Sequence, residues 1–136
     1  MRLKRDALDA AFSDYIRWRD KWICRRCKAP YSPPTASYQC AHVFTRGCLS
    51  IRHDPDNAVG LCAGCHMWGS ANSEKFKDWC EHELGKTHME KLRFKYYARG
   101  AKVTKSEREL LRQHFVKLTA EIKGKLMDNF TPDSSK

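Results

Sequence analysis

The chain has 136 residues and a formal net charge of +10, because 26 Lys or Arg stand against 16 Asp or Glu. This length fits one domain with a helical extension, and the charge indicates a polyanionic partner, either a nucleic acid or an anionic membrane surface. Since no apolar run is long enough to cross a bilayer, we expect no membrane-spanning segment.

The cysteine content bears on the redox compartment. The first residues, Met-Arg-Leu-Lys-Arg-Asp, are not followed by the apolar segment of a signal peptide. We therefore expect a cytoplasmic protein. In that reducing compartment the seven cysteines serve better as thiolate ligands and buried side chains than as disulfides.

The N-terminal half is predicted to contain one helix and two strands. Apolar side chains at steps of three and four residues predict a helix over 4–22, and three prolines mark a loop over 29–37. Strands are expected at 38–44 and 58–61. The connection between them, residues 45–57, is long, which is common in functional loops.

The C-terminal half is predicted to be helical. Ser73 can cap a helix that runs to Leu84, where Gly85 suits the end of a helix. Two capping boxes, Thr87 to Glu90 and Thr104 to Glu107, predict two further helices. Residues 128–136 are expected to form a disordered tail.

Two Cys-x-x-Cys knuckles are the most specific motif in the chain. They are Cys24-Arg-Arg-Cys27 and Cys62-Ala-Gly-Cys65. Two such knuckles converging on one tetrahedral ion form a structural zinc site, whose metal supplies much of the folding free energy of a small core. The segment Cys62 to His66 also has the spacing of a c-type haem attachment site, but haem would leave Cys24 and Cys27 without a role.

Three further residues stand in the order His42, Asn57, His66. A neutral imidazole at His42 is suited to remove a proton from water, and the amide of Asn57 could accept from its ring N–H. His66, fixed beside the second knuckle, could ligate a catalytic cation. The alternative is that His42 is an inert strand residue and that His66 lies on the surface or near the zinc.

The basic excess is concentrated late in the chain. Residues 91–125 hold eleven Lys or Arg against three acidic residues, with aromatic residues among them. This pattern indicates a surface that contacts the nucleic-acid backbone without reading its sequence. The predicted DNA contacts are Arg46, Lys91, Arg93, Lys95, Arg99, Lys102 and Lys105.

The stretch from Cys24 to Asn72 resembles the ββα-metal core of the HNH nucleases, and most closely phage recombination nucleases of the NinG type. The resemblance is carried by Ala41-His42-Val43-Phe44-Thr45-Arg46 and by Arg52-His53-Asp54 before Asn57. It implies an α+β fold in which an N-terminal helix and a C-terminal helical extension flank the zinc-stabilised core. The chain would then divide into the N-terminal helix and nuclease core at 1–86, the basic helical extension at 87–127 and the disordered tail at 128–136.

The resemblance also implies the chemistry. His42 would be the general base, Asn57 its orienting residue and His66 a ligand of catalytic Mg²⁺ or Mn²⁺. The four knuckle cysteines would bind structural Zn²⁺. The expected reaction is hydrolysis of phosphodiester bonds in DNA, with branched recombination intermediates as substrates. The expected location of a phage-encoded nuclease is the cytoplasm of the bacterial host.

Three points stay open at this stage. Many HNH enzymes carry an acidic metal ligand where this chain has Ala41, so water, phosphate, His53 or Asn72 would complete the cation site. The alternative function is a non-catalytic zinc module that binds DNA or a protein. A homodimer would supply the two active sites needed to cut a junction symmetrically.

Overall fold

The computed structural model describes residues 5–45, 47–98 and 103–130, with the backbone alone for 127–130. In this part of the chain the fold is α+β, as expected, with five α-helices and a two-stranded sheet. The elements in chain order are α1 (Ala7–Arg19), β1 (Tyr38–His42), the 3-10 turn η1 (Pro55–Asn57), β2 (Ala58–Cys62), α2 (Ala63–Ala71), α3 (Ser73–Leu84), α4 (Lys86–Ala98) and α5 (Lys105–Phe130).

The two strands form an antiparallel hairpin with a long connection. Tyr38 pairs with Cys62 and His42 with Ala58, so the hairpin carries one predicted histidine at an end of β1 and one knuckle at an end of β2. A side chain at Gly60 would overlap the phenol of Tyr38, whose hydroxyl donates to the Ile23 carbonyl at 2.9 Å. Glycine therefore allows the tyrosine to lie across β2 and to link the sheet to the first knuckle.

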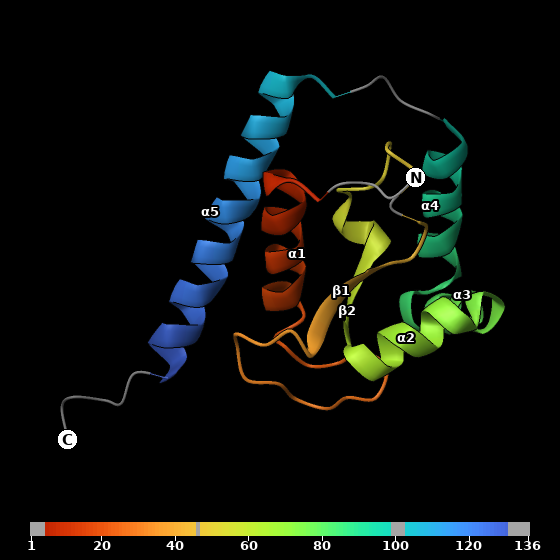
Figure 1. Cartoon of the computed structure of the whole chain (residues 1–136), viewed down its shortest axis with the longest axis horizontal. Coiled ribbons are helices and arrows are strands. Elements are labelled where there is room, and N and C mark those ends of the chain that lie inside the picture. Colours follow the sequence, from red (N-terminus) through yellow and green to blue (C-terminus); the bar gives the residue numbers. More distant parts are fainter. Residues whose placement is uncertain (1–4, 46, 99–102, 131–136) are drawn as a thin grey trace.

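Helix α1 lies between the sheet and α5 (Figure 1). It begins with a capping box in which Asp6 and Asp9 each accept a backbone N–H of the other at 2.9 Å. Its apolar face forms a core with one residue of β2 and one of α5, and the rings of Phe12 and Phe115 meet edge to face at 5.2 Å. The buried members of this core are Leu8, Phe12, Ile16, Ala58 and Phe115. The α5 part of the predicted basic extension is thus packed against the N-terminal helix.

A second core lies between the sheet and helices α2 to α4. Met89 and Leu92 of α4 are buried in it together with Phe76 of α3. The turn between these helices is Gly85, whose φ of 98° is readily adopted only by glycine. Helix α3 ends at Leu84 as predicted, but its N-cap is Asn72, and Ser73, the predicted cap, is the first helical residue. Helix α4, however, begins at Lys86, so Thr87 lies inside the helix instead of capping it.

The predicted cap of α5 is confirmed, but its predicted end is not. The Thr104 hydroxyl accepts the backbone N–H of Glu107 at 3.1 Å. The helix continues to Phe130, so residues 128–130 are helical where we expected the tail to begin, and the tail residues 131–136 lie outside the described part. Within the described residues, no helix combines the length and apolarity needed to span a membrane.

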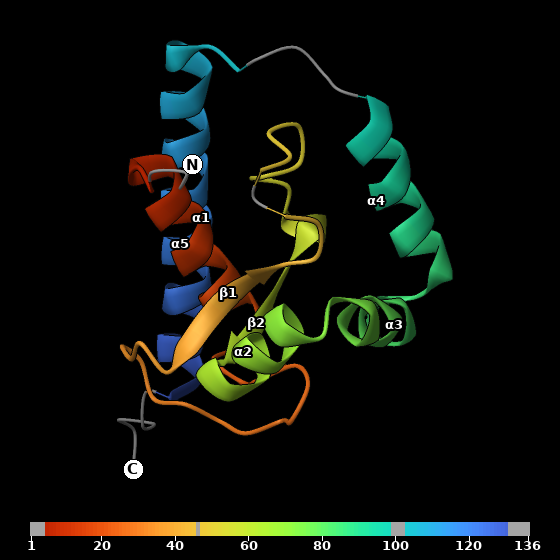
Figure 2. The ribbon, with the colours of Figure 1, turned by 45° about the vertical axis from the view of Figure 1, so that its right-hand side comes forward.

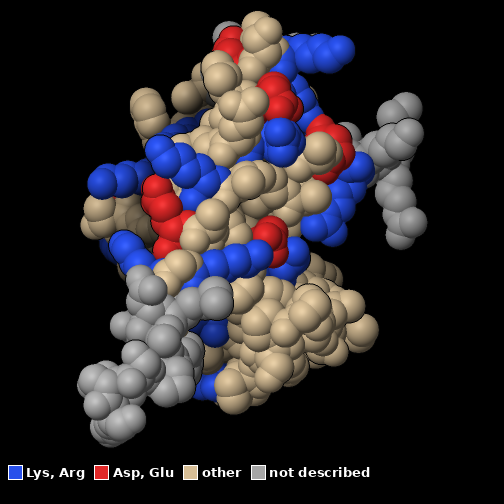
Figure 3. Space-filling model, turned by 90° about the vertical axis from the view of Figure 1, so that its left-hand side faces the viewer, with Lys and Arg blue, Asp and Glu red and all other residues tan. Residues whose placement is uncertain are grey.

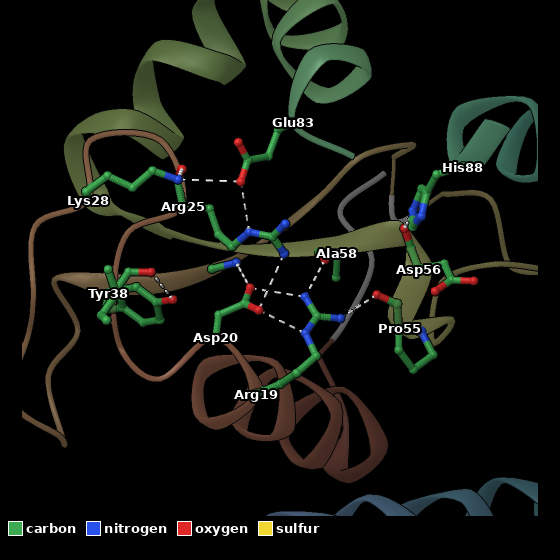
Figure 4. Close-up of polar contacts among 12 residues, drawn as sticks. Arg19, Asp20, Arg25, Lys28, Tyr38, Pro55, Asp56, Ala58, Glu83 and His88 are labelled. Atoms are coloured by element: carbon green, nitrogen blue, oxygen red, sulfur yellow. Dashed lines mark hydrogen bonds and ion pairs between the residues drawn. The ribbon is translucent and has the colours of Figure 1, made fainter. Parts of the chain in front are cut away.

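The end of α1 is tied to β2 by a polar network (Figure 4). Arg19 donates to the carbonyl oxygens of Pro55 and Ala58 at 2.7 and 2.8 Å. Asp20 accepts the backbone N–H of Gly60 at 2.7 Å and pairs with Arg25, which follows the first cysteine of the first Cys-x-x-Cys knuckle. These contacts fix the first knuckle relative to the hairpin.

Helices α4 and α5 lie on opposite flanks of the molecule (Figures 1 and 2). The sheet and α1 lie between them. The lysines and arginines of 91–98 and 105–125 are therefore divided between two flanks instead of forming one continuous surface.

Candidate metal centre and catalytic groove

The two knuckles converge. The sulfur atoms of Cys24, Cys27, Cys62 and Cys65 all lie within 4.8 Å of one another. Each knuckle directs a backbone N–H at its first sulfur, from Cys27 to Cys24 at 3.5 Å and from Cys65 to Cys62 at 3.4 Å. Four converging sulfurs with these internal hydrogen bonds are the donor set of a structural zinc site, so the residues fit the predicted ion.

The electrostatics of the cluster favour a bound dication. Burial acts to raise the pKa of Cys62, but hydrogen bonds from the Cys65 backbone and the Tyr31 hydroxyl outweigh it and lower this pKa to about 6. Burial raises the pKa of Cys65 to about 12, although the Arg26 guanidinium donates to its sulfur at 3.5 Å. Four thiolates so close together repel one another, and a cation that binds all four relieves that repulsion.

His42 is held by a backbone carbonyl. Its Nε2 lies 2.9 Å from the carbonyl oxygen of Arg52, and its ring lies 5.8 Å from that of Phe12. Because a carbonyl only accepts hydrogen bonds, we assign the proton to Nε2 and the basic lone pair to Nδ1. The side chain of Arg52 is buried and donates to both carboxylate oxygens of Asp9, through Nε at 2.9 Å and through Nη2.

Asn57 is fully buried and supports the loop that carries this carbonyl. Its Oδ1 accepts the backbone N–H of Phe44 at 2.7 Å, and its Nδ2 donates to the carbonyls of Phe44 and Ile51 at 3.0 and 3.1 Å. The predicted bond between Asn57 and the His42 ring is not among these contacts, and the Arg52 carbonyl accepts from His42 instead. Asn57 therefore supports His42 indirectly, because it binds the carbonyl of Ile51, the residue that precedes Arg52.

His66 has a partner that sequence analysis missed. Its Nδ1 lies 2.7 Å from Oε1 of Gln39 on β1, and the Gln39 amide nitrogen donates to the Ala36 carbonyl at 3.1 Å. This second bond sets which end of the amide faces the ring, so Nδ1 carries the proton and Nε2 carries the lone pair. Burial lowers the pKa of His66 below its usual value, which favours the neutral ring that binds cations.

Both histidines line one groove of about 1180 Å³. Its walls come from α1, β1, residues 33–36, α2 and α5. Gln39 lines the same groove, so the predicted base, the predicted ligand and the residue bonded to that ligand share one opening. This placement of residues from separate elements was not predictable from spacing alone.

The other candidate ligands lie elsewhere. His53 bonds Asp9 at 2.7 Å, and the Asn72 amide donates to the Trp68 carbonyl at 2.9 Å. Among the described residues, ligand-type side chains gather in groups of three or more at the four cysteines and at Asp6, Asp9 and His53. His66 belongs to neither group, so most ligands of a cation there would be water and phosphate.

The predicted DNA contacts have varied surroundings. Lys91, Arg93 and Lys105 are exposed, whereas Lys95 pairs with Asp54 at 2.8 Å. Arg46, Arg99 and Lys102 lie outside the described residues. On the face shown in Figure 3, Lys and Arg alternate with Asp and Glu instead of forming one uniform basic patch.

Comparisons of the chain with protein-family models, with curated proteins and with solved structures gave no match. The case for a function therefore depends on the sequence motif and on the geometry of this site.

Proposed function

We propose that this protein is a zinc-stabilised, divalent-metal-dependent endonuclease of the HNH type that hydrolyses phosphodiester bonds in DNA. The observation that carries the proposal is the pair of histidines in one groove, each with one ring nitrogen engaged by an acceptor. His42 directs Nε2 at the Arg52 carbonyl and His66 directs Nδ1 at Gln39, and we assign the role of base to His42 and that of ligand to His66.

The chemistry follows from these assignments. Nδ1 of His42 accepts a proton from a water molecule, whose oxygen attacks the phosphorus as the bond to the 3′ oxygen breaks. The leaving 3′ oxygen takes a proton from solvent, so the products, by the resemblance to HNH nucleases, are a 5′ phosphate and a 3′ hydroxyl. The Arg52 carbonyl stabilises the imidazolium that forms, because its bond to the Nε2 proton strengthens when the ring is charged. A cation bound at His66 would supply charge stabilisation for the phosphate and the leaving oxygen.

The four cysteines would hold structural zinc and thereby the start of α2, on which His66 lies. Magnesium or manganese fits the cation position because these ions commonly retain several water ligands. Branched recombination intermediates are the proposed substrates, by the resemblance to NinG-type nucleases.

A cleavage assay tests the proposal. Purified, desalted protein with its zinc retained would be incubated with supercoiled plasmid and four-way-junction DNA, with and without added Mg²⁺ or Mn²⁺. We expect cutting that needs the added ion and is lost in His42→Ala and His66→Ala. His82→Ala, which removes an exposed histidine of α3, is the matched control and should cut normally. Tight DNA binding without any cutting would contradict the proposal and favour the non-catalytic zinc module.

A further inference from the structure

Three cations lie at the groove, of which Arg5 and Arg17 were outside the predicted DNA surface and Lys123 was within its range of 91–125. Arg5 precedes the N-cap of α1, Arg17 lies in the last turn of that helix, and Lys123 comes from α5. The acidic residues at the groove are Asp9, which is bonded to Arg52, and Asp14, which lies 3.6 Å from Arg17. Lys123 is exposed and has no acidic partner among the described ion pairs.

Aromatic rings alternate with these cations. The Lys123 ammonium lies 5.1 Å from the centre of the Trp18 ring, and the Arg17 guanidinium lies 5.7 Å from that of Trp22. The two indole rings meet edge to face at 5.8 Å. Trp22 is buried, so Trp18, which is only half-buried, is the ring that an incoming group can reach.

We infer that this groove binds a DNA strand through unpaired nucleotides, with a base stacked on Trp18 and phosphates contacted by Arg17 and Lys123. This inference rests on the proposed nuclease function and specifies its substrate. Alternating cations and aromatic rings bind single strands because an unpaired base exposes its face, whereas a base inside a duplex is already stacked on its neighbours. A strand held there passes His42 and His66, which line the same groove.

The cations of α4 are less well placed for this contact. Helix α4 lies on the flank opposite α5 (Figure 2), and Lys95 is neutralised by Asp54 and Asp56. The strand that enters the catalytic groove therefore meets α1 and α5 first.

Binding measurements in a His42→Ala background test the inference without cleavage. Labelled single-stranded DNA and its duplex would be titrated by fluorescence anisotropy at several salt concentrations. We expect the single strand to bind more tightly than the duplex. Arg17→Gln with Lys123→Gln should weaken single-strand binding on the order of tenfold and reduce the salt slope by about 1.4. Lys91→Gln with Arg93→Gln, the matched pair on α4, should change binding less than about twofold.

Tryptophan fluorescence supplies an independent measurement. Binding of the single strand should quench the wild-type signal, and most of this quenching should disappear in Trp18→Phe but persist in Trp79→Phe. The inference is overturned if duplex binds as tightly as single strand, or if the α4 pair weakens binding more than the groove pair does. If the double variant melts at a lower temperature than wild type, the single variant Lys123→Gln, at an exposed position, replaces it in the binding measurement. If the wild-type protein does not cleave DNA but its single-strand binding still depends on Arg17 and Lys123, only the proposed nuclease function is overturned.

Discussion

The His42 imidazole donates through Nε2 to the carbonyl oxygen of Arg52, 2.9 Å away. The side chain of the same arginine is held by Asp9 of α1. The position of the proposed base is thus set by a buried ion pair between the N-terminal helix and the long connection of the hairpin. This contact links the stability of the N-terminal helix to the geometry of the site.

Breaking this ion pair should be costly. In Arg52→Leu the carboxylate of Asp9 stays buried and loses its bidentate partner, and a buried pair broken on one side typically costs about 3–5 kcal/mol. Urea denaturation should show this loss, while Asp9→Leu combined with Arg52→Leu should recover part of it. A loss below about 1 kcal/mol in the single variant would contradict the structural role of the pair.

Asn57→Ala should act differently from His42→Ala. Removing the amide takes away the hydrogen bonds that Asn57 makes to the N–H and carbonyl of Phe44 and leaves the Ile51 carbonyl only its bond from the Asp54 N–H, at a cost of about 3 kcal/mol or more in the free energy of unfolding. His42→Ala should abolish cutting at a much smaller cost. Thermal melts and cleavage rates of both variants would separate support of the loop from chemistry. Equal stability of the two variants would refute this distinction.

The zinc prediction concerns composition and folding. Elemental analysis should find one zinc per chain. Cys27→Ser should lower zinc occupancy and unfold helices α2 to α4, which share a core with the knuckle cysteines. Cys48→Ser, which alters a cysteine outside the cluster, is the control and should retain the ion. Full helical content by circular dichroism after zinc removal would show that the ion does not support the fold.

The tautomers of the two histidines can be observed by nitrogen NMR at neutral pH. We expect His42 to carry its proton on Nε2 and His66 on Nδ1. Gln39→Leu should remove the preference at His66 and lower Mn²⁺ affinity there about 10- to 100-fold, as loss of a residue that orients a metal-bound histidine typically does. Mn²⁺-induced broadening of the His66 signals measures the affinity. The opposite tautomer at His66 would remove its role as a ligand.

Sequence reasoning succeeded where spacing alone defines structure. Two Cys-x-x-Cys pairs can converge on one ion whatever lies between them, and the end of α3 followed from Gly85. It failed at Thr87, because Gly85 alone turns the chain and the next helix restarts at Lys86. Thr87 therefore lies within helix α4 and not at its N-terminal cap position.

The orienting groups of the site were beyond sequence reasoning for a different reason. The acceptor for His42 is the backbone carbonyl of Arg52. Every residue has such a carbonyl, so the identity of the residue at position 52 does not predict this hydrogen bond. Gln39 and His66 are far apart in sequence and meet only once β1 and α2 are in place. The groove joins Arg17 to Lys123 in the same way, through the packing of Phe12 against Phe115.

The rate of DNA cleavage in His42→Ala, compared with wild type at equal zinc content and saturating Mg²⁺ or Mn²⁺, tests the central claim most directly. Loss of a general base should lower the rate by about 10²-fold to 10⁴-fold while DNA binding is unchanged. A variant that cuts at the wild-type rate would show that His42 is not the base and that the proposed nuclease site is wrong.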